Sequence, residues 1–218
     1  MTSPVFISMR RRKDIKDYLK RFWRFIWHDD SIWSWIANAA IAFVLIKFIV
    51  YPGLGLLLGT THPIVAVVSG SMEHDGSFDE WWSVHEDYYT DLNITKEQFR
   101  EFPFNNGFNT GDIMVLYGKE PADIELGDII VYWGRKPEPI IHRVVDIEED
   151  EELDFQTKGD HNLRSDISEM DIEKEYLVGY DKYEKGSVAV VRIPFLGYIK
   201  IAFVSLVNTL KVALTNIM

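Results

Sequence analysis

The sequence predicts a mainly β domain carried by an N-terminal transmembrane helix, with a partly helical insert and a C-terminal apolar helix. Three observations support this fold class: one long apolar segment, seven short β-prone segments separated by turn residues, and a strong charge asymmetry between the two sides of the apolar segment. With 218 residues, of which 47% are hydrophobic, the chain can form one folded domain and some extra segments.

The apolar segment runs from about Ile32 to Leu58 and contains a single charged residue, Lys47. A membrane-spanning helix needs about 20 mostly apolar residues. Pro52 predicts that the helix ends near Tyr51. The segment is too long, and starts too far into the chain, for a cleaved secretory signal. A buried core helix of a soluble protein is the remaining alternative.

Charge predicts how the segment is oriented. Residues 1–30 contain 8 Lys/Arg and 4 Asp, whereas residues 59–190 contain 11 Lys/Arg and 30 Asp/Glu. By the positive-inside rule, we expect a cytoplasmic tail (1–30), an anchor (31–58) and an extracytoplasmic domain (59–195) at the cell membrane, with membrane lipid as a partner. The net charge of −11 argues against a nucleic-acid partner. The absence of cysteine excludes disulfides and thiolate chemistry, and we expect no cofactor and no metal.

Residues 62–195 alternate between β-prone runs and turn signals such as Asn106-Gly107 and Gly127-Asp128. The acidic run Glu148–Asp154 is interpreted as a solvated loop. The predicted strands are Ile64–Val68, Ile113–Tyr117, Ile129–Trp133, Ile140–Val145, Phe155–Lys158, Tyr176–Tyr180 and Ser187–Arg192.

Two segments depart from the β pattern. Residues 74–109 are rich in aromatic and acidic residues, and Thr95 resembles a helix N-cap, so we expect a partly helical inserted subdomain. Its aromatics are interpreted as a small core, with a binding surface as the alternative. Residues 196–218 have apolar residues at helical spacing, which predicts a membrane-associated helix that either spans the bilayer or lies in its interface.

Three short motifs contain residues suited to catalysis. Ser71 follows the β-prone run 64–68 in the sequence Ser69-Gly70-Ser71-Met72, His142 lies inside an apolar strand, and Asp160 lies in a turn with Asp166 six residues later. Each motif alone is weak, because a serine after glycine is usually a turn residue and a lone strand histidine is usually a core residue. Together they supply a nucleophile, a base and a carboxylate to orient the base.

The combined motifs resemble the type I signal peptidases, and more narrowly the archaeal and endoplasmic-reticulum branch that uses a Ser-His pair. The motifs are SGSM at 69–72, GDI at 111–113 and 127–129, HRV at 142–144 and KGD at 158–160. In the bacterial branch a lysine base stands where this chain has His142. Two departures are His161, where the family usually has asparagine, and the insert 74–109.

The resemblance implies a membrane-bound serine endopeptidase that removes signal peptides from translocated precursor proteins, with accessory subunits left open. It implies Ser71 as nucleophile, His142 as general base, Asp166 as the orienting carboxylate and Asp160 as a supporting residue. The Ser71 backbone N–H and the Ser69 hydroxyl would bind the oxyanion. The substrate would add as a strand beside Ile64, Val65, Ala66, Val67 and Val68.

Three other functions stay open at this point. A self-cleaving repressor of the related fold would also use a strand-end serine, but such proteins are soluble and use a lysine base. A non-catalytic, membrane-anchored interaction module would use the insert as its binding surface. A narrow-specificity processing protease of the same fold would act on one precursor, such as a pilin-like protein.

Overall fold

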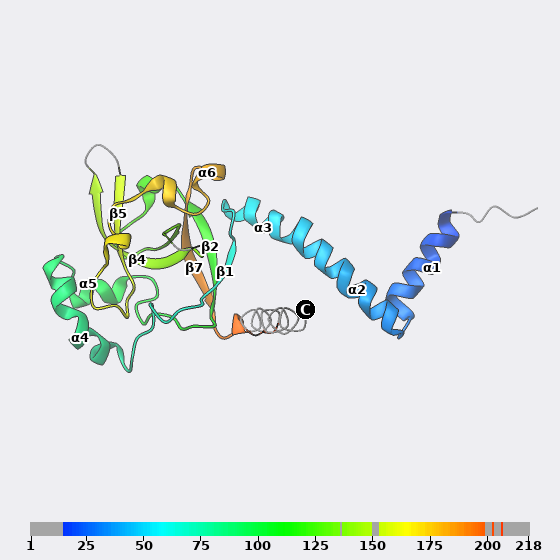
Figure 1. Ribbon diagram of the computed structural model, residues 1–218, viewed down its shortest axis with the longest axis horizontal. Coiled ribbons are helices and arrows are strands. Elements are labelled where there is room, and N and C mark those ends of the chain that lie inside the picture. The colour runs from blue at the N-terminus through cyan, green and yellow to red at the C-terminus, as the bar shows by residue number, and fades with distance from the viewer. Residues whose placement is uncertain (1–14, 136, 150–152, 199–201, 203–205, 207–218) are drawn as a thin grey trace, which may run out of the picture. The chain divides into compact units, whose positions relative to one another are not determined.

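The computed structural model describes residues 15–135, 137–149, 153–198, 202 and 206 (Figure 1). Residues 1–51 and 52–218 form two compact units, which are described separately. The helices are α1 (Ile15–His28), α2 (Ile32–Leu45), α3 (Tyr51–Leu58), α4 (Phe78–Asp91), α5 (Lys96–Glu101) and α6 (Tyr180–Tyr183), with a π-helical turn η1 (Ile46–Val50) and 3₁₀ turns η2 (Pro121–Asp123), η3 (Ile167–Glu169) and η4 (Lys174–Tyr176). The strands are β1 (Ile64–Ala66), β2 (Ile113–Lys119), β3 (Ile129–Tyr132), β4 (Ile140–Glu149), β5 (Leu153–Lys158), β6 (Ile172–Glu173) and β7 (Gly186–Ile193).

The N-terminal unit contains two helices joined by side-chain hydrogen bonds. The Ser34 hydroxyl donates to the Phe25 carbonyl at 2.7 Å, and the Asn38 amide donates to the Ile26 carbonyl at 3.0 Å. These bonds satisfy carbonyls in the last turn of α1, which have no partner within that helix. Basic and apolar residues alternate at helical spacing along α1, as expected of an amphipathic helix at a membrane surface.

The apolar helix is continuous from Ile32 to Leu58, and among the described residues it alone is long and apolar enough to span a membrane. Its side chains are mostly exposed, which differs from a buried core helix. The predicted end near Tyr51 is wrong. The π-helical turn η1 directly precedes α3, and the Tyr51 N–H bonds to the Ile46 carbonyl. Bonds with this longer spacing let the helix continue past Pro52, which cannot donate a bond of its own.

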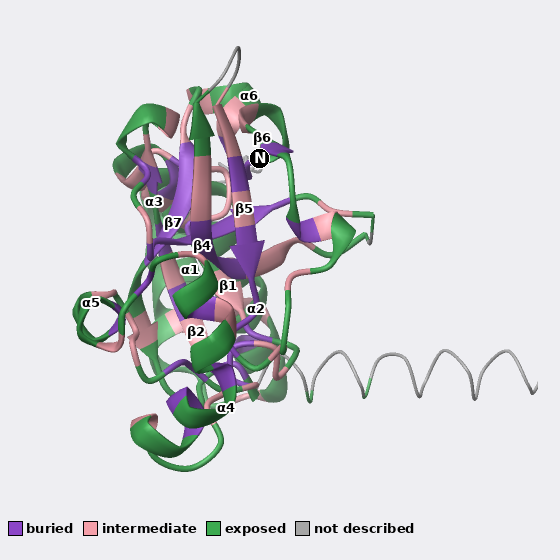
Figure 2. Cartoon of the chain, turned by 90° about the vertical axis from the view of Figure 1, so that its left-hand side faces the viewer, coloured by how far each residue is buried: buried purple, intermediate pink, exposed green. Residues whose placement is uncertain are grey.

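The second unit confirms the predicted mainly β fold. Seven strands in the described part of the chain form one antiparallel sheet in the order β1-β2-β7-β3-β4-β5-β6. Within the described residues β1 pairs with β2 alone, so it lies at one edge of the sheet. Figure 2 shows buried residues along β4, β5 and β7.

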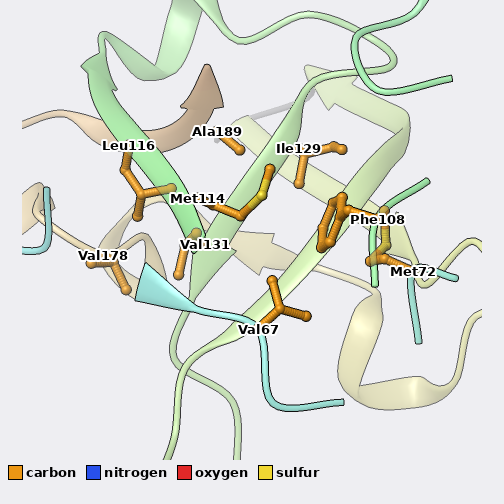
Figure 3. Close-up of a cluster of buried hydrophobic side chains, with 9 residues drawn as sticks. All are labelled: Val67, Met72, Phe108, Met114, Leu116, Ile129, Val131, Val178 and Ala189. Carbon is orange, nitrogen blue, oxygen red and sulfur yellow. The ribbon is translucent and has the colours of Figure 1, made fainter. Parts of the chain in front are cut away.

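Strand β3 has both faces buried, so it lies at the centre of the fold. Ile129 and Val131 join Met114 and Leu116 of β2 in one apolar cluster (Figure 3). Ile130 and Tyr132 point to the opposite face and belong to a second cluster. Because successive side chains of a strand alternate between faces, four consecutive apolar residues fill both layers.

The insert is partly helical, as predicted, and its aromatics form a core. Trp81, Trp82, Tyr89 and Phe99 are buried together with Val145 of β4, so α4 and α5 pack against the sheet. Thr95 caps α5, since its side chain accepts the Gln98 N–H at 3.2 Å. The helices and β4 lie close together in Figure 1. The alternative interpretation of these aromatics as a binding surface is not favoured, because they are buried.

The two GDI motifs form matching turns. Gly111 and Gly127 have φ of +89° and +91°, a conformation that glycine adopts without a side-chain clash. The Asp112 carboxylate accepts the backbone N–H of residue 109 at 2.8 Å, and Asp128 accepts that of residue 125 at 2.9 Å. Arg192 pairs with Asp112 and Lys119 with Asp128, both at 2.6 Å. Each motif therefore ties a turn to a neighbouring strand through a buried carboxylate.

Three predicted details differ from the structure. Residues 176–180 do not form a strand: Tyr176 ends η4, Tyr180 begins α6, and Leu177 between them makes only a single bridge to Tyr132. Residues 172–173 form β6, which was not predicted. The acidic run is not a loop throughout, since β4 continues to Glu149 and β5 begins at Leu153. The predicted C-terminal helix (196–218) falls mainly on residues 199–201, 203–205 and 207–218, which lie outside the described residues.

Candidate active site

Ser71 and His142 meet at hydrogen-bond distance, 3.0 Å between Oγ and Nε2. Ser71 lies just beyond β1, where backbone bonds between Val67 and the turn at 111–112 extend the strand pairing. His142 lies on β4 opposite Ile130 and is 7% exposed. The imidazole is therefore largely shielded from water, while the serine hydroxyl is only partly buried.

The segment around Ser71 is fixed from both sides. The Ser71 carbonyl accepts the His161 N–H at 2.9 Å, and the Met72 carbonyl accepts the Phe108 N–H at 3.0 Å. Met72 itself is fully buried. A Cβ at Gly159 would lie 2.7 Å from the Ser71 carbonyl oxygen and 2.9 Å from His142 Nε2. The glycine of the KGD motif is therefore needed for the close approach of the two residues.

The carboxylate beside His142 belongs to Glu169, the last residue of η3. Glu169 Oε1 and His142 Nδ1 are in ion-pair contact, and Glu169 is 2% exposed. Nδ1 has no hydrogen bond in this geometry, so the contact is close but not aligned. The second carboxylate oxygen accepts the Asp166 backbone N–H at 2.8 Å.

Asp166 does not occupy the place predicted for it. Its exposed side chain caps η3, where Oδ1 accepts the Ser168 backbone N–H at 2.7 Å and also contacts the Ser168 hydroxyl. These hydrogen bonds favour the ionised form and hold the pKa of Asp166 below its usual value. The carboxylate is engaged in its own turn, because Asp is a strong helix N-cap.

Asp160 lies on the other side of β4 from His142 and bonds to Arg143, at 2.9 Å from Nε and 2.8 Å from Nη2. It also bonds to His74 Nε2 at 3.0 Å. Full burial by itself raises the pKa of Asp160, but Arg143 and His74 more than offset it, so the pKa lies far below its ordinary value. Asp160 therefore joins β4 to the insert, and none of the hydrogen bonds that the structure gives its carboxylate reaches His142.

The remaining predicted residues surround the serine. The Ser69 and Ser71 hydroxyls lie 3.2 Å apart. In the run predicted to bind substrate, Ile64 and Val68 are exposed and Val65 and Ala66 are half-buried. Val67 is 2% exposed and belongs to the core cluster of Figure 3, so its contribution to a substrate site is limited to its backbone.

A local sequence signal could have indicated that Asp166 caps a turn. Asp166 and Glu169 have the spacing of a capping box, in which the first side chain caps the turn and the second bonds back to the first backbone N–H. Both bonds are present. That pattern predicts that the Asp166 carboxylate serves the turn and that Glu169 folds back beside it.

No family model matches the chain. Its relatives are signal peptidase complex catalytic subunits. SEC11 of Colletotrichum graminicola is 32% identical over 188 residues, which cover 84% of this chain and 88% of the relative. Human SEC11C is 31% identical over 155 residues, covering 69% of this chain and 60% of the relative. SEC11 of Fusarium vanettenii is 29% identical over 161 residues, 71% of each chain.

Proposed function

We propose that Ser71 and His142 are the nucleophile and the general base of a signal peptidase, since the chain belongs to the signal peptidase family. The protein is a membrane-anchored serine endopeptidase that removes N-terminal signal peptides from precursor proteins. The observation that carries the assignment of roles is the 3.0 Å contact between Ser71 Oγ and His142 Nε2. A non-catalytic module has no need for a serine held against a shielded imidazole.

In the reaction, Ser71 Oγ attacks the scissile carbonyl carbon while its proton passes to His142 Nε2. The Ser71 backbone N–H and the Ser69 hydroxyl stabilise the oxyanion of the tetrahedral intermediate. The imidazolium then donates its proton to the departing amine as the C–N bond breaks, which leaves an acyl-enzyme. Water, deprotonated by His142, then attacks the ester carbonyl carbon. The C–Oγ bond breaks, His142 returns the proton to Ser71 Oγ, and the signal peptide leaves as a carboxylate.

The substrate binds as an extended strand along β1, with specificity for small residues next to the scissile bond. This proposal is supported by the position of β1 at the sheet edge and by the short connection from β1 to Ser71. An edge strand offers unpaired backbone groups, so an added peptide strand gains main-chain hydrogen bonds. The half-buried Val65 and Ala66 would give shallow contacts that accept alanine-sized side chains.

The proposed topology keeps residues 1–30 in the cytoplasm and residues 59–195 on the extracytoplasmic face of the cell membrane. The basic N-terminal segment and the acidic remainder support it through the positive-inside rule. The relatives are named as catalytic subunits of a complex, and on that ground we expect accessory subunits to assemble with this chain.

The test uses the full chain in detergent micelles with a fluorogenic peptide that spans a signal-peptide cleavage site. Ser71→Ala and His142→Ala should each lose activity by about 10⁴-fold or more with the melting temperature unchanged. His142→Lys should not restore the activity that His142→Ala loses. A lysine acts as a base near neutral pH only when it is desolvated, and this site is built around an imidazole. His161→Ala is the matched control: it removes an exposed histidine near the site and should keep full activity. Substantial cleavage by Ser71→Ala would end the serine-protease assignment.

A further inference from the structure

We propose that Glu169 is the positioning carboxylate of His142, and that Asp166 acts one step further out by holding Glu169. The inference rests on the proposed function, because it assigns the third member of the same site. It rests on a contact between a buried carboxylate and the imidazole nitrogen that faces away from Ser71.

Burial shows that the Glu169 carboxylate has few partners available to it. Its side chain is 3% exposed, and the His142 imidazole is the one side chain in ion-pair contact with it among the described residues. A buried carboxylate requires charged or hydrogen-bonding partners. Here one oxygen faces His142 Nδ1 and the other accepts the Asp166 N–H, so the carboxylate is held between the imidazole and the backbone.

The turn that carries Glu169 is braced against the sheet. The Glu169 N–H bonds to the Asp166 carbonyl at 3.0 Å, and its carbonyl accepts from the Thr157 hydroxyl of β5 at 3.4 Å. The Tyr132 hydroxyl of β3 lies 3.0 Å from the same Thr157 hydroxyl. These contacts fix where the side chain begins, which is what a positioning residue requires.

This arrangement selects a tautomer of the neutral imidazole. With its proton on Nδ1 facing Glu169, His142 presents the Nε2 lone pair to the Ser71 hydroxyl. After Nε2 accepts the serine proton, the Glu169 charge stabilises the imidazolium. The Nδ1 contact is close but not aligned as a hydrogen bond in the substrate-free protein, and poorly aligned catalytic hydrogen bonds commonly become aligned when substrate binds.

Glu169→Gln is the sharpest variant because the capping box dictates how the amide is oriented. The Asp166 N–H needs an acceptor, so the glutamine carbonyl should face it and the amide NH₂ should face His142 Nδ1. A donor at that place favours the tautomer with its proton on Nε2, which cannot accept from Ser71. Glutamine also keeps the capping box, so the variant should fold.

The experiment measures Glu169→Gln and compares it with Asp166→Asn, both on the full chain in detergent. Glu169→Gln should lower kcat by about 10²–10⁴-fold with little change in KM or melting temperature. Asp166→Asn should lose far less kcat than Glu169→Gln, because asparagine is as good an N-cap and the backbone N–H that holds Glu169 is retained. Imidazole ¹⁵N shifts at about pH 8, assigned to His142 by their loss in His142→Gln, should report the Nδ1–H tautomer in wild type and the Nε2–H tautomer in Glu169→Gln.

The outcomes separate this inference from the proposed function. If the wild type cleaves the peptide and Glu169→Gln keeps its kcat, or Asp166→Asn loses more than Glu169→Gln, the assignment of Glu169 is overturned while the peptidase stands. Unchanged ¹⁵N shifts in Glu169→Gln also overturn it. If the wild type does not cleave but the tautomer still depends on Glu169, the positioning role stands and the proposed function fails.

Discussion

His142 and Arg143 are neighbours on β4, yet they belong to two regions with opposite properties. Successive side chains of a strand point to opposite faces, so His142 faces Ser71 and Glu169 while Arg143 faces the insert. The His142–Glu169 side chains are 9% and 3% exposed, whereas those of Arg143 and Asp160 are both 0% exposed. One strand thus contributes a histidine to a pair beside the half-buried Ser71 on one face and an arginine to a fully buried pair, the sealed pair, on the other.

The difference between the pairs lies in how many hydrogen-bonding positions are already filled. Arg143 has five N–H donors, and the structure gives each an acceptor: two bonds go to Asp160 and three to the carbonyls of residues 103, 104 and 127. His142 keeps Nε2 for the Ser71 hydroxyl. Because every N–H donor of Arg143 already has an acceptor, the Arg143–Asp160 pair can only stabilise the fold. His142 has Nε2 available to accept the proton of Ser71.

The largest expected effect comes from breaking the sealed pair. Arg143→Met leaves the Asp160 charge buried beside His74 and removes the donors to three carbonyls, so we expect a loss of about 3–5 kcal/mol in the free energy of unfolding. Chemical denaturation in detergent, followed by circular dichroism, measures it. His142→Gln, one residue away, should change stability by less than about 1 kcal/mol while abolishing cleavage. Equal stability of the two variants would remove the distinction between the faces.

A second prediction concerns the face of β4 that carries His142. Substitutions there should change the rate of cleavage and leave the stability of the fold unchanged. Ser69→Ala removes a hydroxyl 3.2 Å from the nucleophile, and if it donates to the oxyanion kcat should fall by about 10²-fold. Ser69→Thr, which keeps a hydroxyl, should recover most of the rate. Steady-state kinetics and a melting curve for each variant test this. An unchanged kcat in Ser69→Ala would remove Ser69 from the oxyanion site.

A smaller effect on stability is expected from pH, through a histidine of the insert on the side of β4 that carries the Arg143–Asp160 pair. Burial, assisted by the nearby Lys158 charge, lowers the pKa of His85 in α4 to about 4. The unfolded chain binds this proton near pH 6.5, so the folded state loses stability as pH falls from about 6.5 to 4. Asp160 contributes little over that interval, because the unfolded chain binds the Asp160 proton only near its ordinary pKa of 3.8, and the stability that comes from its lowered folded pKa is lost below that pH.

The measurement is the free energy of unfolding at several pH values for wild type and His85→Gln. The wild type should lose about 2 kcal/mol between pH 6.5 and 4, and the variant should lose clearly less, since glutamine does not titrate. A variant with the same pH dependence as wild type would show that another group controls the acid side.

The fold class and the helical insert could be predicted because their signals are local. Turn residues separate the strands, and Thr95 caps a helix that the structure confirms. The run 176–180 is apolar and β-prone, but tertiary contacts leave only one bridge at Leu177. The continuation of the helix past Pro52 was not predicted either. A proline predicts a helix end and does not indicate the π-helical turn that accommodates it.

The sequence by itself determined the long apolar segment, the mainly β class and the motifs that contain Ser71 and His142, since apolar runs, turn residues and short motifs act over a few neighbouring residues. Tertiary structure alone decided which carboxylate meets the imidazole. Asp160, Asp166 and Glu169 all lie within ten residues of one another, yet one pairs with Arg143, one caps a turn and one faces His142. Strand alternation and the capped turn set these directions, and they depend on the three-dimensional path of the chain.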